Sequence, residues 1–105
     1  MTREHAFRKQ LRPGAAEEYR RRHDAIRPDL ASLLTAVGIG DYSIDLDVAT
    51  GSLFAVQRLA AGERTAALSP HTVMRRWWGH RADLTQINPD GSPLVTPLVR
   101  VFHLD

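Results

Sequence analysis

The sequence predicts an α+β fold of the ferredoxin-like type, with a four-stranded antiparallel sheet that carries both helices on one face. Two observations predict it. Segments with period-two alternation occur near both ends of the chain and as a central pair, and segments with helical periodicity stand between them. The resulting order is β-α-β-β-α-β, the split βαβ arrangement. A chain of 105 residues has the length of a single domain, which would span residues 1–105.

Alternating side chains mark the expected strands, which cover residues 6–11, 42–47, 53–59 and 98–104. In the first of them, Phe7, Lys9 and Leu11 fall on one side of the chain and the intervening residues on the other. A Thr-Gly-Ser turn joins the two central strands, which therefore predict a hairpin.

The first helical segment follows a Pro-Gly turn and has apolar positions at 3-4 spacing. They are Ala16, Tyr19, His23, Ile26, Leu30 and Val37. Tyr19 and His23 therefore stand one turn apart on the face that packs inward. Pro28 lacks a backbone donor, so the helix should kink or break there. A histidine on this face is either a core residue or a catalytic one.

The second helix is expected over residues 71–84, after a short helical turn at 63–68. Ser69 would cap it and Pro70 would take its first position. Trp77 and Trp78 are adjacent, so their rings point about 100° apart. Either one ring lies in the core and the other is partly exposed, or both line a pocket for a sugar, whose ring has an apolar face and a polar rim.

The composition excludes several classes of site. The chain has no cysteine, so it has no disulfide and no thiolate metal site. Its five histidines lack the spacings of metal motifs, so a metal site would have to combine residues distant in the sequence, and no phosphate-binding glycine loop is present to support nicotinamide or nucleotide chemistry. The net charge is +2, and the three arginines at 20–22 fan around a helix, which does not favour nucleic-acid binding.

No apolar stretch approaches the length of a membrane span, and no signal core precedes the first strand, so we expect a cytoplasmic protein without membrane contact. One face of the predicted sheet has no cover within the chain. Four apolar side chains could lie on it, namely Phe54, Val56, Val99 and Val101. We therefore expect a homodimer that packs sheet against sheet.

Aromatic residues with hydrogen-bonding tips gather on the inner side of this fold. They are Tyr19, His23, Tyr42, Trp77 and Trp78. Such a group could bind a neutral polyol without a net charge.

These residues belong to motifs by which the chain resembles the L-rhamnose mutarotases over nearly its whole length. The motifs are Tyr19-Arg20-Arg21-Arg22-His23, Pro28-Asp29-Leu30, Tyr42-Ser43-Ile44, Leu46-Asp47, Trp77-Trp78, Asn88-Pro89-Asp90-Gly91-Ser92-Pro93 and Val101-Phe102-His103-Leu104. Their order and spacing are those of the family, which makes the resemblance specific.

The resemblance implies a dimeric α/β barrel of ferredoxin-like subunits that interconverts the α and β anomers of L-rhamnose without a cofactor. It implies that His23 is the catalytic acid and that Tyr19, Tyr42, Trp77 and Trp78 bind the sugar. Two places depart from the family pattern, Arg27 and the Gly79-His80-Arg81 run. If Arg27 or Arg81 lines the pocket, the preference could shift, even to an acidic sugar.

Mutarotation needs a proton delivered to the ring oxygen and one removed from the anomeric hydroxyl. We expect His23 to protonate the ring oxygen, while Tyr19, Asp24 or a water could be the base. Two other functions stay open: a cofactor-independent oxygenase or haem-degrading enzyme of the same barrel type, and a sugar-binding or assembly protein without catalysis.

Overall fold

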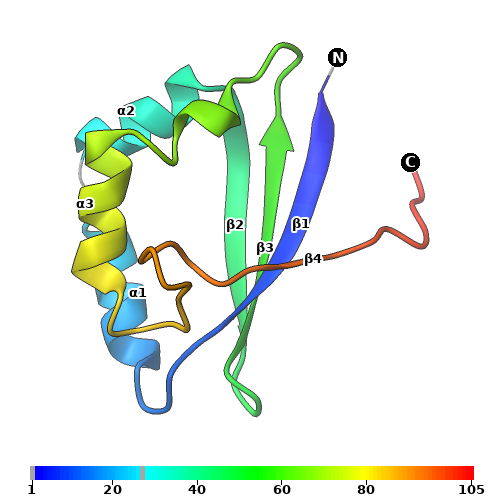
Figure 1. Cartoon of the computed structure of the whole chain (residues 1–105). Helices are drawn as coiled ribbons and strands as arrows, with labels where there is room; N and C mark the ends of the chain where they lie inside the picture. The colour runs from blue at the N-terminus through cyan, green and yellow to red at the C-terminus, as the bar shows by residue number, and fades with distance from the viewer. Residues whose placement is uncertain (1, 27) are drawn as a thin grey trace.

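The computed structural model describes residues 2–26 and 28–105, and the departure at Arg27 lies outside the described residues. The strands are β1 (Arg3–Gln10), β2 (Ile39–Asp47), β3 (Ser52–Leu59) and β4 (Thr96–Pro97); the helices are α1 (Ala16–Asp24), α2 (Pro28–Ala36), the 3₁₀ turn η1 (Thr65–Ala67) and α3 (Thr72–Arg81). The sheet has the order β2-β3-β1-β4 with antiparallel pairs. Figure 1 shows the helices on one side of the sheet. The predicted ferredoxin-like order is confirmed.

The alternation in β3 sorts its side chains between the two faces of the sheet. Leu53, Ala55 and Leu59 are buried under the helices, whereas Phe54 and Val56 are exposed on the other face. The helices cover only one face of the sheet, so buried and exposed positions alternate along β3, although apolar residues occur on both faces.

The helix break at Pro28 is confirmed. α1 ends at Asp24, and α2 begins with Pro28 as its first residue, the position at which a missing backbone donor costs least. Arg22 then ties α1 to the end of α3, because its guanidinium binds the Asp83 carboxylate at 2.9 Å and the His80 carbonyl. The arginines of α1 therefore serve partly as ties between helices.

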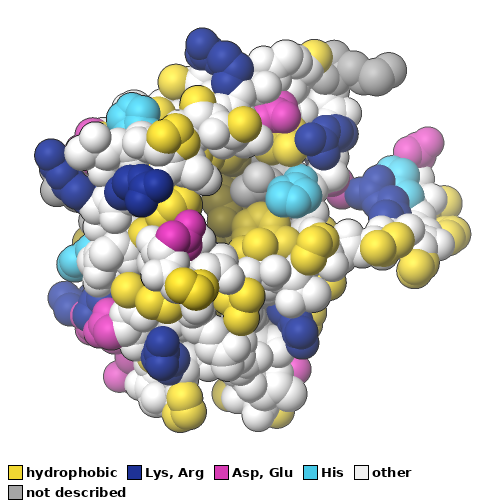
Figure 2. Space-filling view, in the orientation of Figure 1, with side chains coloured by type: hydrophobic (Ala, Val, Ile, Leu, Met, Phe, Trp, Pro, Cys, Tyr) yellow, Lys and Arg dark blue, Asp and Glu magenta, His cyan; other side chains and the backbone are white. Residues whose placement is uncertain are grey.

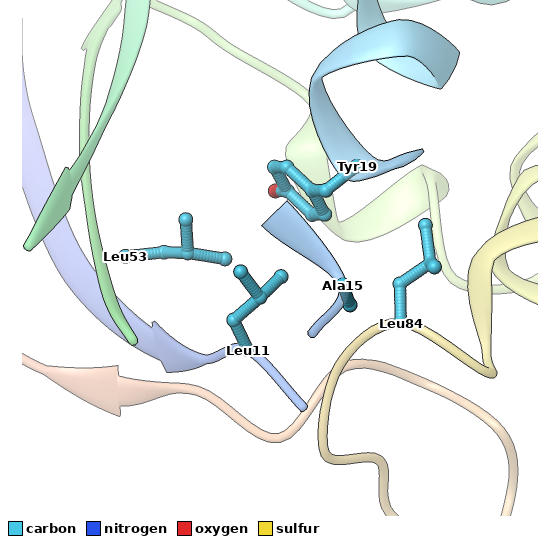
Figure 3. Packing of buried hydrophobic residues seen from close by; sticks show 5 residues of the cluster. All are labelled: Leu11, Ala15, Tyr19, Leu53 and Leu84. Atoms are coloured by element: carbon cyan, nitrogen blue, oxygen red, sulfur yellow. The ribbon is translucent and has the colours of Figure 1, made fainter. Parts of the chain in front are cut away.

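The core consists of three separate clusters. One joins β1, α1 and β3 at one end of the sheet and contains Leu11, Ala15, Tyr19, Leu53 and Leu84 (Figure 3). A second lies between α2 and α3 and contains Leu30, Trp77 and Trp78. The third contains Val37, Ile39 and Leu59. Because the clusters that join helices to sheet lie apart, the middle of the inner sheet face is left for a site.

A β-bulge in β2 decides which way Tyr42 points. Gly40 pairs with Arg58 and Ser43 pairs with Val56, so two residues of β2, Asp41 and Tyr42, stand opposite Gln57 alone. Asp41 takes the positive φ of 46° that this irregular step requires. Without the extra residue Tyr42 would pair with Val56 on the outer face; the bulge returns it to the inner one.

The start of α3 differs from the prediction. His71, and not Ser69, is the N-cap: its Nδ1 accepts a hydrogen bond from the Val73 amide at 3.2 Å. An imidazole nitrogen with a lone pair can do what a serine oxygen does at this position. The helix also ends at Arg81, three residues earlier than expected.

Of the two alternatives for the tryptophan pair, the one with a partly exposed ring is wrong. Both rings are buried, each with 9% of its surface exposed. This is possible because α3 packs against α2 on one side and faces α1 and the sheet on the other, so neighbouring directions on the helix are both covered.

The prediction of a closing strand over residues 98–104 is wrong. The fourth strand is the short β4, and the chain beyond it has no regular structure. Val99, Val101, Phe102 and Leu104 are exposed, with Val101 at 94%. A strand needs the backbone hydrogen bonds of a neighbour, and past the Leu98 amide, which bonds to the Ala6 carbonyl, none is formed by this segment within residues 2–26 and 28–105.

Within residues 2–26 and 28–105, no helix combines the length and the hydropathy that crossing a bilayer requires.

Candidate functional site

A hollow lies between the helical layer and the inner face of the sheet, with hydrophobic side chains at its bottom (Figure 2). On the sheet side, the rings of His5, Phe7 and Tyr42 follow one another at centroid distances of 5.2 and 6.4 Å. On the helix side, α1 brings Tyr19 and His23, and α3 brings Trp77. Aromatic rings from two layers therefore face one space.

His23 is held between two aromatic rings. Its imidazole stacks on Tyr19 with centroids 4.1 Å apart, and it meets Trp77 edge to face at 5.1 Å. The i, i+4 spacing on α1 produces the first contact, and the packing of α3 beside α1 produces the second. The ring is half-buried, so it is fixed in position and still reachable by a ligand.

The hydrogen bond of His23 determines which nitrogen is available for chemistry. Nδ1 lies 2.9 Å from the carbonyl oxygen of Tyr19. A carbonyl only accepts, so Nδ1 carries the hydrogen and Nε2 has a free lone pair in the neutral ring. Burial lowers the pKa of His23 below its ordinary value, and the charges of Lys9 and Arg81 lower it further. The imidazole is therefore mainly neutral at pH 7.

Tyr42 stands at the rim of the site. It is 37% exposed, its ring meets Phe7 edge to face, and burial of its hydroxyl raises its pKa. It lies close enough to Tyr19 to contribute to the raised pKa of that residue, which is about 12 and is caused mainly by burial. Both phenols are therefore neutral hydrogen-bonding groups at pH 7.

Trp78 shares a core cluster with Trp77 but not the aromatic contacts of Tyr19 and His23. Its ring packs in the cluster between α2 and α3, together with Leu30 and Met74. Its indole Nε1 is buried and has no hydrogen-bond partner in the described part of the chain. The structure thus brings Tyr19, His23 and Trp77 into contact and places Tyr42 nearby. Trp78 adds an indole N–H that has no hydrogen-bond partner among the described residues.

Two cationic residues at this site were not among the predicted site residues. Lys9 is 5% exposed, and its Nζ donates to the Tyr19 hydroxyl at 3.2 Å. Burial and the charge of Arg81 lower the pKa of Lys9 to about 7. The strand alternation had placed Lys9 on the same side as Phe7 and Leu11, which was the available signal.

Arg81 is the second of these residues, and it is 3% exposed. Its Nη1 donates to the Thr85 hydroxyl at 3.2 Å, and its Nε is buried without a partner among the described residues. Its charge acts on the pKa of Tyr19, of Tyr42 and of Lys9, so all three lie within electrostatic range of it. The sequence had signalled Arg81, because it belongs to the Gly79-His80-Arg81 run that departs from the family pattern and was named as a residue that could line the pocket.

A cavity of about 450 Å³ lies elsewhere, on the outer side of α1, α2 and α3. Of the predicted site residues only Trp77 reaches it, and its rim carries Arg21, Arg76 and His80. The groups suited to proton transfer and hydrogen bonding gather instead in the hollow on the sheet side. We therefore place the candidate site there.

The chemistry available in the hollow is that of proton transfer and hydrogen bonding. Among residues 2–26 and 28–105, no group of three or more histidine, aspartate or glutamate side chains is arranged to hold a metal ion.

Comparison with known proteins identifies relatives over almost the whole chain. The family model described as L-rhamnose mutarotase matches residues 4–104. An L-rhamnose mutarotase of Acidiphilium cryptum is 56% identical over 94% of this chain and 95% of its own length, and one of Burkholderia orbicola is 54% identical over 95% and 96%. The crystal structure of L-rhamnose mutarotase from Formosa agariphila superposes with a TM-score of 0.91 at 37% identity, covering 98% of this chain and 99% of that one.

Proposed function

The chain belongs to the L-rhamnose mutarotase family, and from this premise we propose that it is an isomerase that interconverts the α and β anomers of L-rhamnose. The observation that carries the proposal is the setting of His23. Its ring is fixed between Tyr19 and Trp77, its Nδ1 is engaged with a backbone carbonyl, and Nε2 is left for a substrate.

We assign the proton transfer to His23. Neutral Nε2 takes the proton of the anomeric hydroxyl while the bond from the anomeric carbon to the ring oxygen breaks. Its electrons go to the ring oxygen, the carbonyl forms, and the imidazolium delivers the proton to the ring oxygen. Both oxygens are bonded to the same carbon, so one nitrogen can serve both. Closure on the other face of the carbonyl reverses the steps and yields the other anomer.

The other candidates for the base are less suitable. A phenol with a pKa of about 12 holds its proton too strongly, which argues against Tyr19. Asp24 is exposed at the end of α1, where water solvates its carboxylate, although its charge still acts on His23. A single histidine that accepts and returns the proton needs neither residue.

The remaining predicted residues would bind the sugar. Trp77 offers an apolar edge beside His23, and the hydroxyls of Tyr19 and Tyr42 offer hydrogen bonds to sugar hydroxyls. Trp78 has a buried indole donor that still lacks a partner. No step requires a metal or an organic cofactor.

The proposal includes a cytoplasmic homodimer in which residues 1–105 form one domain. Two features of the described chain support the dimer. Phe54 and Val56 are exposed on the uncovered sheet face, and apolar side chains of residues 98–104 project beyond the sheet. A second copy of the chain, packed sheet to sheet as in a dimeric α/β barrel, would cover both.

Saturation-transfer NMR of L-rhamnose tests the function directly. We expect the protein to accelerate anomer exchange, and His23→Asn to reduce the acceleration about 10²–10⁴-fold. His80→Asn is the matched control, because His80 belongs to the outer cavity.

If His80→Asn loses activity and His23→Asn keeps it, the site is the outer cavity and the assignment is wrong. A protein that binds L-rhamnose without accelerating exchange would be a sugar-binding protein. Haem breakdown or oxygen uptake with a quinol, without anomer exchange, would favour the oxygenase alternative.

A further inference from the structure

Two buried cations without a counter-charge stand out at the proposed sugar site. Lys9 and Arg81 are 5% and 3% exposed. The hydrogen bonds of Lys9 Nζ and Arg81 Nη1 go to neutral hydroxyls, those of Tyr19 and Thr85. In the described part of the chain, no ion pair joins either of them to an aspartate or glutamate.

Such an arrangement is costly in the empty protein. A buried charge is normally paired, because the protein interior replaces the solvation lost from water only when an opposite charge or several hydrogen bonds are supplied. Here the two like charges also oppose each other: burial and the charge of Arg81 lower the pKa of Lys9 to about 7, so Lys9 is about half protonated at pH 7, and an anion beside it would favour the charged form. The site is thus electropositive and undersatisfied until something enters it.

One donor is visibly unused. The Nε–H of Arg81 is buried and has no partner among the described residues. This hydrogen belongs to the planar fork with which guanidinium groups bind carboxylates through two parallel bonds. Lys9, which already reaches the Tyr19 hydroxyl, stands as the second cation beside it.

The two cations also lie beside the reacting groups. Lys9 bonds to Tyr19, whose ring stacks on His23, and the charges of both Lys9 and Arg81 act on His23. A sugar held against His23 and Trp77 would therefore bring one of its substituents near them. The methyl group of L-rhamnose could satisfy neither cation.

We propose that Lys9 and Arg81 form an anion subsite in the sugar pocket, and that the preferred substrate is a hexuronate, a pyranose with a carboxylate where L-rhamnose has its methyl group. This inference rests on the proposed mutarotase function and deepens it. A carboxylate replaces the methyl group on the same carbon, so the rest of the ring keeps its contacts with His23, Trp77 and the tyrosines.

Anomer exchange measured by saturation-transfer NMR on three matched sugars tests the proposal. They are L-rhamnose, L-mannuronate and L-mannose, which differ only in carrying a methyl, a carboxylate or a hydroxymethyl group at one carbon. After subtraction of each uncatalysed rate, we expect kcat/KM for L-mannuronate to exceed that for L-rhamnose at least about tenfold, as a charge-assisted hydrogen bond implies. L-mannose controls for a merely polar substituent and should show no such gain.

The outcomes distinguish a failure of the anion subsite from a failure of the mutarotase function. Acceleration of L-rhamnose with no preference for L-mannuronate overturns the subsite and leaves the mutarotase function standing. No acceleration with any of the three sugars contradicts both. An equal gain with L-mannose and L-mannuronate overturns the charge argument, because polarity alone would then explain the preference.

Variants assign the effect to the two cations. In Lys9→Met and in Arg81→Met, the ratio of kcat/KM for L-mannuronate to that for L-rhamnose should fall at least about tenfold. The exposed Arg75→Met removes the same charge from α3 and should leave the ratio unaltered. Both rates come from one preparation, so a partly unfolded variant does not distort the ratio. An unchanged ratio in both inner variants would show that these cations only hold the tyrosines in place.

Discussion

At the scale of single residues, the surroundings of His23 determine how it can react. The backbone carbonyl of Tyr19 holds the hydrogen on Nδ1, so proton exchange with a ligand goes through Nε2. Burial, Lys9 and Arg81 favour the neutral ring, whereas the Tyr19 carbonyl and the charge of Asp24 act in the opposite direction. The balance is a lowered pKa, which leaves the imidazole neutral and ready to accept a proton at pH 7.

A pH profile of activity tests whether His23 reacts as the neutral imidazole. The active form at the start of the reaction is neutral His23, so kcat/KM for L-rhamnose should be level near pH 7 and should fall as the pH drops through the lowered pKa of His23. Removing a nearby positive charge with Arg81→Met raises this pKa and moves the acid limb to higher pH. Removing a negative charge with Asp24→Asn moves it the other way. Shifts of the same sign in both variants would contradict the assignment.

Lys9 and Arg81 illustrate a conflict at the residue scale between stability and binding. Replacing buried charges by apolar side chains of similar volume often stabilises a protein by about 1–4 kcal/mol. The two buried charges beside the aromatic pocket therefore lower the stability of the fold. An anionic ligand would recover that loss on binding, since it supplies the missing counter-charge.

At the scale of elements, two local breaks shape the site. Pro28 ends the helical segment that carries Tyr19 and His23, so α1 and α2 can take different directions over the sheet (Figure 1). The bulge in β2 returns Tyr42 to the inner face. Each break follows from one or two residues, and each changes which side chains face the hollow.

The cap of α3 gives a prediction at this scale. His71→Ala removes the acceptor for the Val73 amide and should lower the free energy of unfolding by about 1 kcal/mol, the usual cost of losing an N-cap. His71→Asp supplies a carboxylate acceptor and should retain most of the stability. Urea unfolding at one fixed protein concentration measures both. Equal stabilities of the two variants would show that the cap contributes nothing.

At the scale of the whole molecule, the main feature is the face of the sheet that the helices do not cover. Figure 1 shows that the chain beyond β4 leads away from the helices and the strands. Its apolar side chains have no surface of the same chain to pack on, and Phe54 and Val56 are exposed on the sheet. Exposed apolar groups of this kind mark interaction surfaces.

The proposed dimer is tested by sedimentation at micromolar concentration. The full chain should have twice the mass of 11.8 kDa, whereas a chain that ends at Leu98 should sediment as a single copy. Residues 99–105 form no element of the fold, so the far-UV circular dichroism should keep its shape after truncation. A full-length chain that sediments at the mass of one copy would refute the dimer.

The sequence alone determined the order of elements, the break at Pro28 and the inward face of α1. These follow from local rules, because the alternation of a strand, the spacing of a helix and the missing donor of proline all act within a few residues. The same alternation placed Lys9 on one side with Phe7 and Leu11, and the tryptophan pair was marked as core or pocket wall. The catalytic role of His23 stays a prediction.

Only the tertiary structure decided which of these residues meet. The burial of both tryptophans depends on two helices that lie far apart in the sequence, and the side on which Tyr42 lies depends on a bulge that is defined by its partner strand. The pairing of residues 98–104 depends on hydrogen bonds from a neighbour that local pattern cannot supply. Lys9 and Arg81 are likewise far apart in the sequence. They lie at one site because the folded chain packs α3 over the inner face of the sheet that contains β1.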